Sequence, residues 1–212
     1  SLTPTVLMEK AIAAIGSKEA LSNIKDVQLK GTANLMGQSL QMQQTIVMPG
    51  NAVTTMSMGS MAIMKQAVVD GKYSVAQQGM EMPITDDLKE GLDASATLVP
   101  EQLFLTKGYG LKIVGAEKVD GKDAIDVEVT TPSKKVSHRF YDAKTFLLVK
   151  TSKSEEVPGQ GTMTQQQFYS GYKTVNGLQI SSEQLMDLGQ MKINIKYTDM
   201  KANQGLKVTD LK

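Results

Sequence analysis

The 212-residue chain contains no cysteine, no tryptophan, one histidine and a single arginine, Arg139. Without cysteine, disulfide bonds, thiolate metal sites and cysteine nucleophiles are excluded. A single arginine excludes an anion site built from several guanidinium groups, which are the side chains best suited to bidentate contacts with phosphate or carboxylate. The 23 basic and 22 acidic side chains nearly balance, so the chain also lacks the strong basic charge typical of nucleic-acid-binding proteins. We therefore expect no nucleic-acid partner.

Long apolar runs are missing too, since none approaches the ~20 residues that a helix needs to cross a bilayer. We expect no integral membrane segment. A chain of this length can form one large β domain or two small ones, and can bury roughly 70% of its unfolded surface. No flexible linker divides the sequence, so we expect residues 1–212 to form a single domain.

Apolar and polar residues alternate along most of the chain, a pattern typical of strands with one buried face. Val27, Leu29 and Gly31, for example, alternate with polar neighbours. Asp70-Gly71 and Asn176-Gly177 are strong hairpin signals, because both central residues of a type I′ turn adopt positive φ. About ten or eleven antiparallel strands are predicted, which makes the fold mainly β, within the α+β class.

Helical patterns occur at the start and in the middle of the chain. Residues 3–16 form an amphipathic segment in which Thr3 is the expected N-cap and Pro4 occupies the first helical position. Gly16 is expected to end this helix in a left-handed conformation. Between residues 83 and 108 the period changes again, and two short helices are predicted, one beginning after Thr85 and the other at Pro100.

The most plausible catalytic candidate is His138, which alternation places on the same strand face as Val136 and Phe140. A catalytic base of the triad type needs a nucleophile and an orienting acid beside it, and the sequence indicates neither. A half-buried strand histidine is the favoured interpretation. The acids Asp120, Asp123 and Asp126 surround a turn without the ligand spacing of a calcium loop. We predict no catalytic residues, no metal site and no cofactor, and do not expect the chain to be an enzyme.

Methionine is the unusual component, because nine of the fourteen methionines lie between residues 36 and 82. Thioether side chains are flexible and polarizable, so they suit an apolar surface that must fit variable ligands. The alternative is a core that uses methionine as filler, and both interpretations stay open. The run at residues 57–64 is hard to bury completely, because neighbouring strand residues point to opposite faces. The predicted ligand-binding residues are Met42, Met48, Met56, Met58, Met61 and Met64.

The order of these elements resembles the outer-membrane lipoprotein-sorting superfamily of periplasmic carriers and receptors (LolA/LolB-like). The resemblance rests on AIGSKEAL (14–21), IKDVQLKGTA (24–33), VDGKDAIDVEV (119–129), RFYDAKTFLLVK (139–150) and FYSGYKTVNGLQI (168–180). Similar domains are accessory segments of some bacterial insulinase-type zinc peptidases. The resemblance implies a half-open antiparallel β-barrel whose helices cover a hydrophobic cavity, which holds acyl chains in the carriers. It also implies a periplasmic or otherwise exported protein of a bacterium with an outer membrane.

Two functions follow from this resemblance as expectations. The first is a noncatalytic periplasmic binding domain that accommodates a lipid, an acyl chain or a lipoprotein in a hydrophobic cavity. The alternative is an accessory interaction domain of an insulinase-type peptidase or an envelope complex, with a protein partner and no catalytic residues of its own. The sequence departs from the carriers in two respects. They line the cavity with many aromatic side chains, whereas only 5% of the residues here are aromatic. They hold the lid with an arginine on an early strand, whereas Arg139 lies in the later half of the chain.

Overall fold

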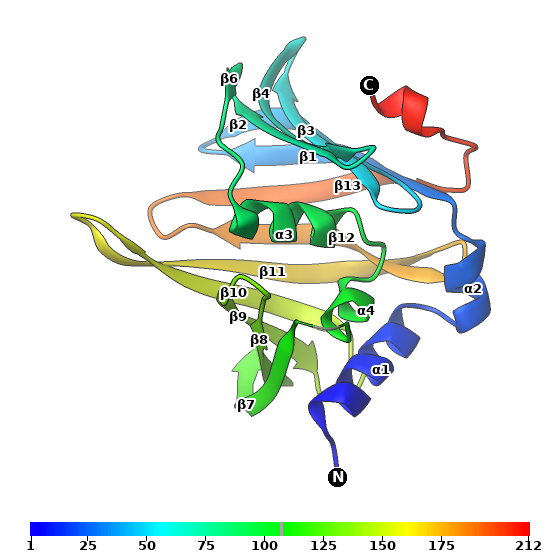
Figure 1. Cartoon of the computed structure of the whole chain (residues 1–212), viewed down its shortest axis with the longest axis vertical. Coiled ribbons are helices and arrows are strands. Elements are labelled where there is room, and N and C mark those ends of the chain that lie inside the picture. Colours follow the sequence, from blue (N-terminus) through cyan, green and yellow to red (C-terminus); the bar gives the residue numbers. More distant parts are fainter. Residues whose placement is uncertain (107) are drawn as a thin grey trace.

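The computed structural model describes residues 1–106 and 108–212. Its strands form one antiparallel sheet in the order β6-β5-β4-β3-β2-β1-β13-β12-β11-β10-β9-β8-β7 (Figure 1). The strands are β1 (Asp26–Leu35), β2 (Gln38–Val47), β3 (Asn51–Met58), β4 (Met61–Val69), β5 (Lys72–Gln77), β6 (Met80–Glu81), β7 (Gly110–Val119), β8 (Lys122–Thr130), β9 (Val136–Asp142), β10 (Leu148–Val157), β11 (Gly161–Val175), β12 (Leu178–Asp187) and β13 (Lys192–Ala202).

This open antiparallel sheet with few helices confirms the predicted mainly β architecture. The predicted number of ten or eleven strands was too low, because the described part of the chain forms thirteen. One strand that the pattern did not predict is β6, whose two residues are too few to show an alternation of apolar and polar side chains.

The described helices are α1 (Pro4–Ile15), α2 (Lys18–Asn23), α3 (Asp86–Ser95), α4 (Pro100–Phe104) and the 3-10 helix η1 (Val208–Leu211). The predicted N-caps are confirmed. The Thr3 hydroxyl accepts a hydrogen bond from the backbone N–H of Val6 at 3.2 Å, and the Thr85 hydroxyl accepts one from Leu88, also at 3.2 Å. Such caps satisfy backbone donors that the first helical turn leaves free.

The predicted left-handed conformation of Gly16 was wrong, since its φ of −178° is extended backbone. Close packing, rather than a special dihedral angle, favours a glycine at this position. A Cβ atom at this position would lie 2.8 Å from Leu178 Cδ2 and 3.2 Å from the carbonyl oxygen of Gly177. The link between α1 and α2 therefore passes close to the β11–β12 turn, and a side chain at position 16 would require Leu178 and the carbonyl group of Gly177 to shift.

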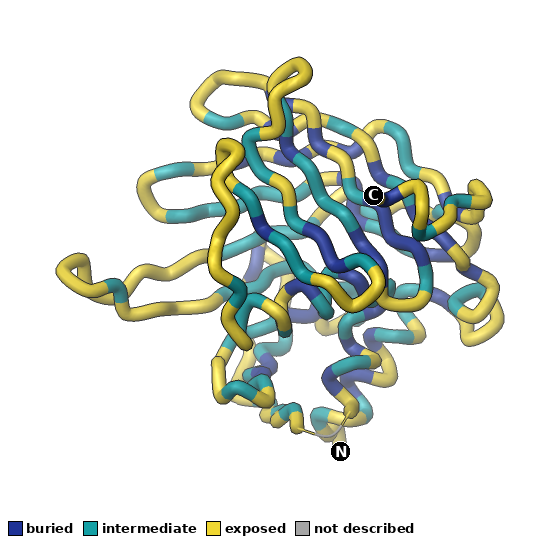
Figure 2. Tube along the Cα trace, turned by 45° about the horizontal axis from the view of Figure 1, so that its top comes forward, coloured by how far each residue is buried: buried dark blue, intermediate teal, exposed yellow. Residues whose placement is uncertain are grey.

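Helices α1, α3 and α4 lie over one face of the sheet, here called the inner face (Figure 1). Leu7, Met8 and Ala11 of α1 pack with Phe104 of α4 on this face at β8 and β9. A separate apolar cluster occupies the inner face where β1, β2 and β13 meet, and includes Leu98 from the segment between α3 and α4. Figure 2 shows that buried residues lie along the middle of the strands, and exposed residues at the hairpin tips.

The joint between β1 and β13 is the one place where neighbouring strands are not consecutive in the chain. The register shifts between Lys30 and Gly31, which leaves Thr198 on β13 without a partner on β1. At this irregularity a Cβ atom on Gly31 would lie 1.9 Å from the carbonyl oxygen of Lys196. Glycine at position 31 therefore permits the backbone approach that holds the two halves of the sheet together.

Replacing Gly31 by alanine should weaken this joint, because the added methyl group overlaps the backbone of β13. We expect the free energy of unfolding to fall by about 1–3 kcal/mol or more, measured by urea denaturation followed by circular dichroism. Gly115→Ala in the edge strand β7 is the matched control, since a Cβ atom there meets nothing within 4 Å. Equal stability of the two variants would contradict the close approach.

Candidate functional site

Three of the predicted ligand-binding methionines form a row on the inner face. Met42 on β2 lies opposite Met56 on β3, and Met56 lies opposite Met64 on β4. Met42 and Met56 are 7% and 6% exposed, whereas Met64 is partly exposed and packs against the same apolar cluster. The row thus extends from the buried centre of the sheet to a partly exposed side chain on β4.

The other three predicted methionines lie elsewhere. Met48 packs beside a small cluster that includes Ile46 on β2 and Ala96, which follows α3. Met58 and Met61 face each other at the turn between β3 and β4, where they are 45% and 55% exposed. The structure therefore divides the six residues between an inner row, a core cluster and an exposed turn, and their role in ligand binding stays a prediction.

Helix α3 is linked to both halves of the sheet by hydrogen bonds. On one side the hydroxyl of Tyr73 on β5 donates to Asp93 at 2.7 Å. On the other, Glu90 accepts from the backbone N–H of Ser133 at 2.8 Å and from its hydroxyl at 2.6 Å. Desolvation by itself would raise the pKa of Glu90, but the hydrogen bonds from Ser133 and Thr131 outweigh this effect and lower the pKa below its usual value. Only Leu92 of α3 is buried, so polar contacts supply much of its attachment.

Helix α4 is attached differently, through a buried ion pair. Arg139 on β9 donates from Nη2 to Glu101 Oε1 at 2.9 Å, and from Nε to the hydroxyl of Tyr141 at 2.9 Å. Tyr141 in turn donates to the same Glu101 oxygen at 2.9 Å. The Glu101 side chain is only 2% exposed, and its second oxygen, Oε2, is buried with no hydrogen-bond partner among the described residues.

The guanidinium group of Arg139 is stabilised in its charged form. Burial by itself would lower the pKa of Arg139, but Tyr141 and Glu101 outweigh this effect and raise it. The guanidinium carbon also lies 5.0 Å from the centre of the Phe104 ring, within the range of a cation–π contact. The one arginine of the chain therefore holds helix α4 on the inner face.

His138 lies on the opposite face of β9. Its Nδ1 atom is 2.8 Å from Asp126 Oδ1 on β8, and its ring stacks on Phe140 with 6.3 Å between ring centres. None of the described hydroxyl groups forms a hydrogen bond with His138. The pair has the acid and the base of a triad but no nucleophile, so its geometry is that of a contact between neighbouring strands.

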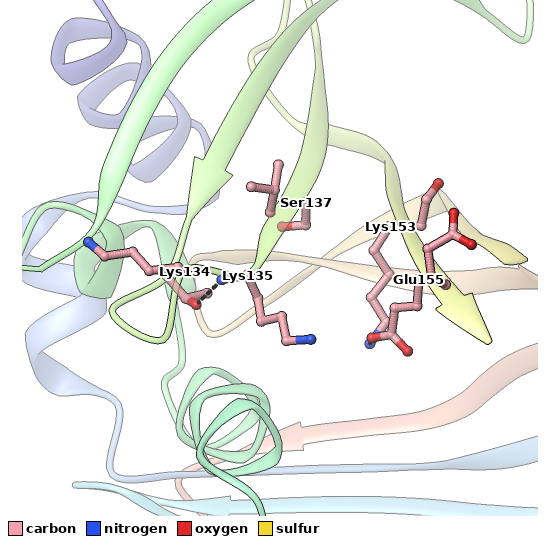
Figure 3. Close-up of a pocket in the computed structure, with 9 residues that line it drawn as sticks. Lys134, Lys135, Ser137, Lys153 and Glu155 are labelled. Atoms are coloured by element: carbon pink, nitrogen blue, oxygen red, sulfur yellow. Dashed lines mark hydrogen bonds and ion pairs between the residues drawn. The ribbon is translucent and has the colours of Figure 1, made fainter. Parts of the chain in front are cut away.

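Two hollows lie side by side along β9 and β10 on the inner-face side. The larger, of about 490 Å³, lies between the β8–β9 turn and β10 (Figure 3), and the smaller, of about 260 Å³, extends to Arg139 and Tyr169. Ser137 and Lys153 line both hollows, so the two form one continuous groove. Sequence reasoning did not predict this groove, because its cations come from a turn and two strands.

The described residues include neither a metal site nor a membrane-spanning helix. No group of three or more acidic or histidine side chains there is arranged to hold a metal ion. No helix in residues 1–106 or 108–212 combines the length and apolar character needed to cross a membrane.

Removing one partner of the buried ion pair should be costly, because the other charge stays buried without compensation. We expect Arg139→Met and Glu101→Leu each to lower the free energy of unfolding by about 3–5 kcal/mol, and the double variant to recover much of that loss. Urea denaturation of the two single variants and the double variant gives the interaction free energy between Arg139 and Glu101. Lys118→Met, in the exposed pair with Asp123, is the control and should change stability little. Additive losses in the double variant would show that the two charges do not interact.

No family model and no curated protein matches this sequence. Solved structures do match. A DUF1329 family protein from Desulfovibrio piger has a TM-score of 0.67 at 12% identity, covering 100% of this chain and 98% of that one. LolA superfamily protein NE2245 from Nitrosomonas europaea has a TM-score of 0.63 at 13% identity, with the same coverage.

A putative outer membrane lipoprotein-sorting protein domain from Vibrio parahaemolyticus is similar as well, with a TM-score of 0.56 at 15% identity. That match covers 96% of this chain and 94% of the other. Each of the three comparisons includes nearly the whole sheet together with the helices on its inner face. The resemblance seen in the sequence is thus confirmed at the level of structure, and the chain has the fold of the LolA superfamily.

Proposed function

We propose that this chain is a noncatalytic binding domain that holds an acyl chain of a lipid or lipoprotein between the inner face of the sheet and helix α3. The observation that carries the proposal is the row formed by Met42, Met56 and Met64, in register across three strands. The row is continuous with the apolar cluster at β1 and β13, and Met64 at its outer end is partly exposed.

The attachment of α3 is suited to admitting such a ligand. The helix buries one residue of its own, Leu92, and polar contacts through Glu90 and Asp93 hold it on either side. Water can replace hydrogen bonds of this kind when the helix moves outward. The movement also exposes little apolar surface, because Leu92 is the one buried residue of the helix. An acyl chain that enters between the helix and the sheet gains about 25 cal/mol for each Å² of apolar surface buried.

A methionine-lined site of this kind recognises apolar length and shape more than chemical detail. Flexible thioether side chains adjust to different chains, so affinity comes from buried area and few polar contacts set specificity. The lipoprotein-sorting domain and the LolA superfamily protein with the same fold support an exported bacterial protein, and we extend that location to this chain.

Organic extraction of the freshly purified folded protein, followed by mass spectrometry, tests the proposal directly. We expect acyl lipid at close to one equivalent, and uptake of a fluorescent fatty-acid probe after delipidation. No extracted lipid together with no probe uptake would overturn the proposal.

A charge at the outer end of the methionine row should prevent binding. We expect Met64→Asp to weaken binding of the fatty-acid probe by about tenfold or more. The acyl chain could then contact the row only if the introduced carboxylate gave up its bound water, which is costly without a partner charge. Met80→Asp is the matched control, since Met80 is 70% exposed at the start of β6. Undiminished binding by a folded Met64→Asp protein would remove the row from the site.

A second candidate is an interaction module for a protein partner, such as a peptidase domain or an envelope complex. It is favoured by exposed methionines at the turns β1–β2, β3–β4 and β5–β6, which an antiparallel meander places at one end of the sheet. The exposed methionines at or beside these turns are Met36, Met58, Met61 and Met80, and Met82, also exposed, follows β6. The flanking residues 57–62 carry no charge, so a partner meets apolar side chains without having to desolvate ions.

This candidate predicts a different sensitivity to mutation. In a pull-down from a cell-envelope extract, Met58→Asp/Met61→Asp should lose any partner that the native chain retains. Binding of the fatty-acid probe should be unchanged in the same variant. A partner retained by the double variant would exclude this turn from the interface.

A further inference from the structure

The groove along β9 and β10 carries positive charge that nearby acids only partly neutralise. Lys134 and Lys135 lie in the β8–β9 turn, and in the part of the chain that the structure describes neither has a carboxylate within 4.0 Å. Lys153 lies opposite them and pairs with Glu155 at 3.2 Å. Figure 3 shows the side chains of Lys135, Lys153 and Glu155 extending to the same side of the strands.

The acids of the groove do not prevent it from binding an anion. Lys153 and Glu155 are 46% and 44% exposed, and an ion pair this open to water holds its partners only weakly. Glu156, the other acid of the larger hollow, accepts a hydrogen bond from Thr162 on β11. Lys153 is therefore free to exchange Glu155 for a ligand that brings its own negative charge.

The inner end of the groove has unused hydrogen-bond donors. A guanidinium group has five N–H donors, and Arg139 donates to Glu101 through Nη2 and to Tyr141 through Nε. No described residue accepts from Nη1. Arg139 lines the smaller hollow together with Ser137, Thr151 and Gln167. These side chains supply further hydrogen-bond donors in the smaller hollow, which Lys153 also lines.

The same hollow joins the apolar part of the inner face. Met186 and Leu188 line it on the side away from the lysines. Both side chains are partly buried and pack against the central apolar cluster, to whose surface Met64 also contributes. A ligand whose polar end lies at Arg139 can thus extend its apolar part over Met186 toward the methionine row without crossing a charged region.

We propose that this groove binds the anionic head group of an acyl lipid, with Lys135 and Lys153 at its mouth and Arg139 at its inner end. The inference rests on the proposed function, because the acyl chain would occupy the inner face described there. The smaller hollow, about 260 Å³, lies below the ~300–1,000 Å³ typical of small-molecule sites. It therefore fits a carboxylate or phosphate head group rather than a whole lipid.

The test compares ligands that share one chain and differ in head-group charge. Binding of hexadecanoic acid and hexadecanol is measured at pH 8 and low salt by displacement of a neutral pyrene-labelled acyl probe. We expect the acid to bind about tenfold more tightly than the alcohol, a ratio that two partly exposed charge contacts can supply. A second pair, palmitoyl lysophosphatidic acid and monopalmitoylglycerol, shows whether a phosphate is preferred to a carboxylate.

The protein variants assign the preference to the groove. Lys135→Gln/Lys153→Gln should bring the acid-to-alcohol ratio close to one and leave the affinity for the alcohol unchanged. Lys18→Gln/Lys112→Gln, which removes two exposed lysines on α2 and β7, should keep the ratio. Equal binding of acid and alcohol by the native protein, or an unchanged ratio in the groove variant, would overturn the head-group site alone. Failure of all four lipids to bind would overturn the proposed function as well.

Discussion

The pairing of β1 with β13 is the constraint on which the rest of the structure depends. All other neighbouring strands are consecutive in the chain, so without this joint the sheet would fall into two separate meanders, β1–β6 and β7–β13. Gly31 makes the joint possible, because its missing side chain leaves room for the carbonyl group of Lys196. Only through this contact do the methionine row of β2–β4 and the Arg139 groove of β9–β10 belong to one continuous face.

Two of the three helices over that face, α3 and α4, are held there by different physical means. Helix α4 is fixed by a charged carboxylate–guanidinium pair withdrawn from water, where the loss of one partner leaves the other uncompensated. Helix α3 is held at its flanks by hydrogen bonds to Tyr73 and Ser133, and buries one residue. Displacing α4 from the inner face therefore costs more free energy than displacing α3.

Local signals in the sequence predicted most of the fold. Thr3 and Thr85 cap helices as expected, because a cap depends on residues three positions apart. Contacts between distant residues were not predictable. Glu101 and Arg139 are 38 positions apart, and neither pattern nor spacing relates them. Gly16 was expected to adopt a special dihedral angle and instead allows close packing. Alternation predicted that the methionines lie on strands. It did not predict which of them would be buried in a row and which would be exposed at turns.

The position of β1 beside β13 also affects how the chain reaches this structure. Asp26, at the start of β1, accepts hydrogen bonds from the backbone of Gln204, Gly205 and Leu206, nearly the whole described chain away. Hairpins between consecutive strands close short loops, whereas this contact closes a very long one, and such distant pairings make folding slow. Until residues near 202 have been synthesised, the edge of β1 stays unpaired and available to other chains. Among the strand pairings of the sheet, the one that joins its two halves is thus the last to become possible during translation.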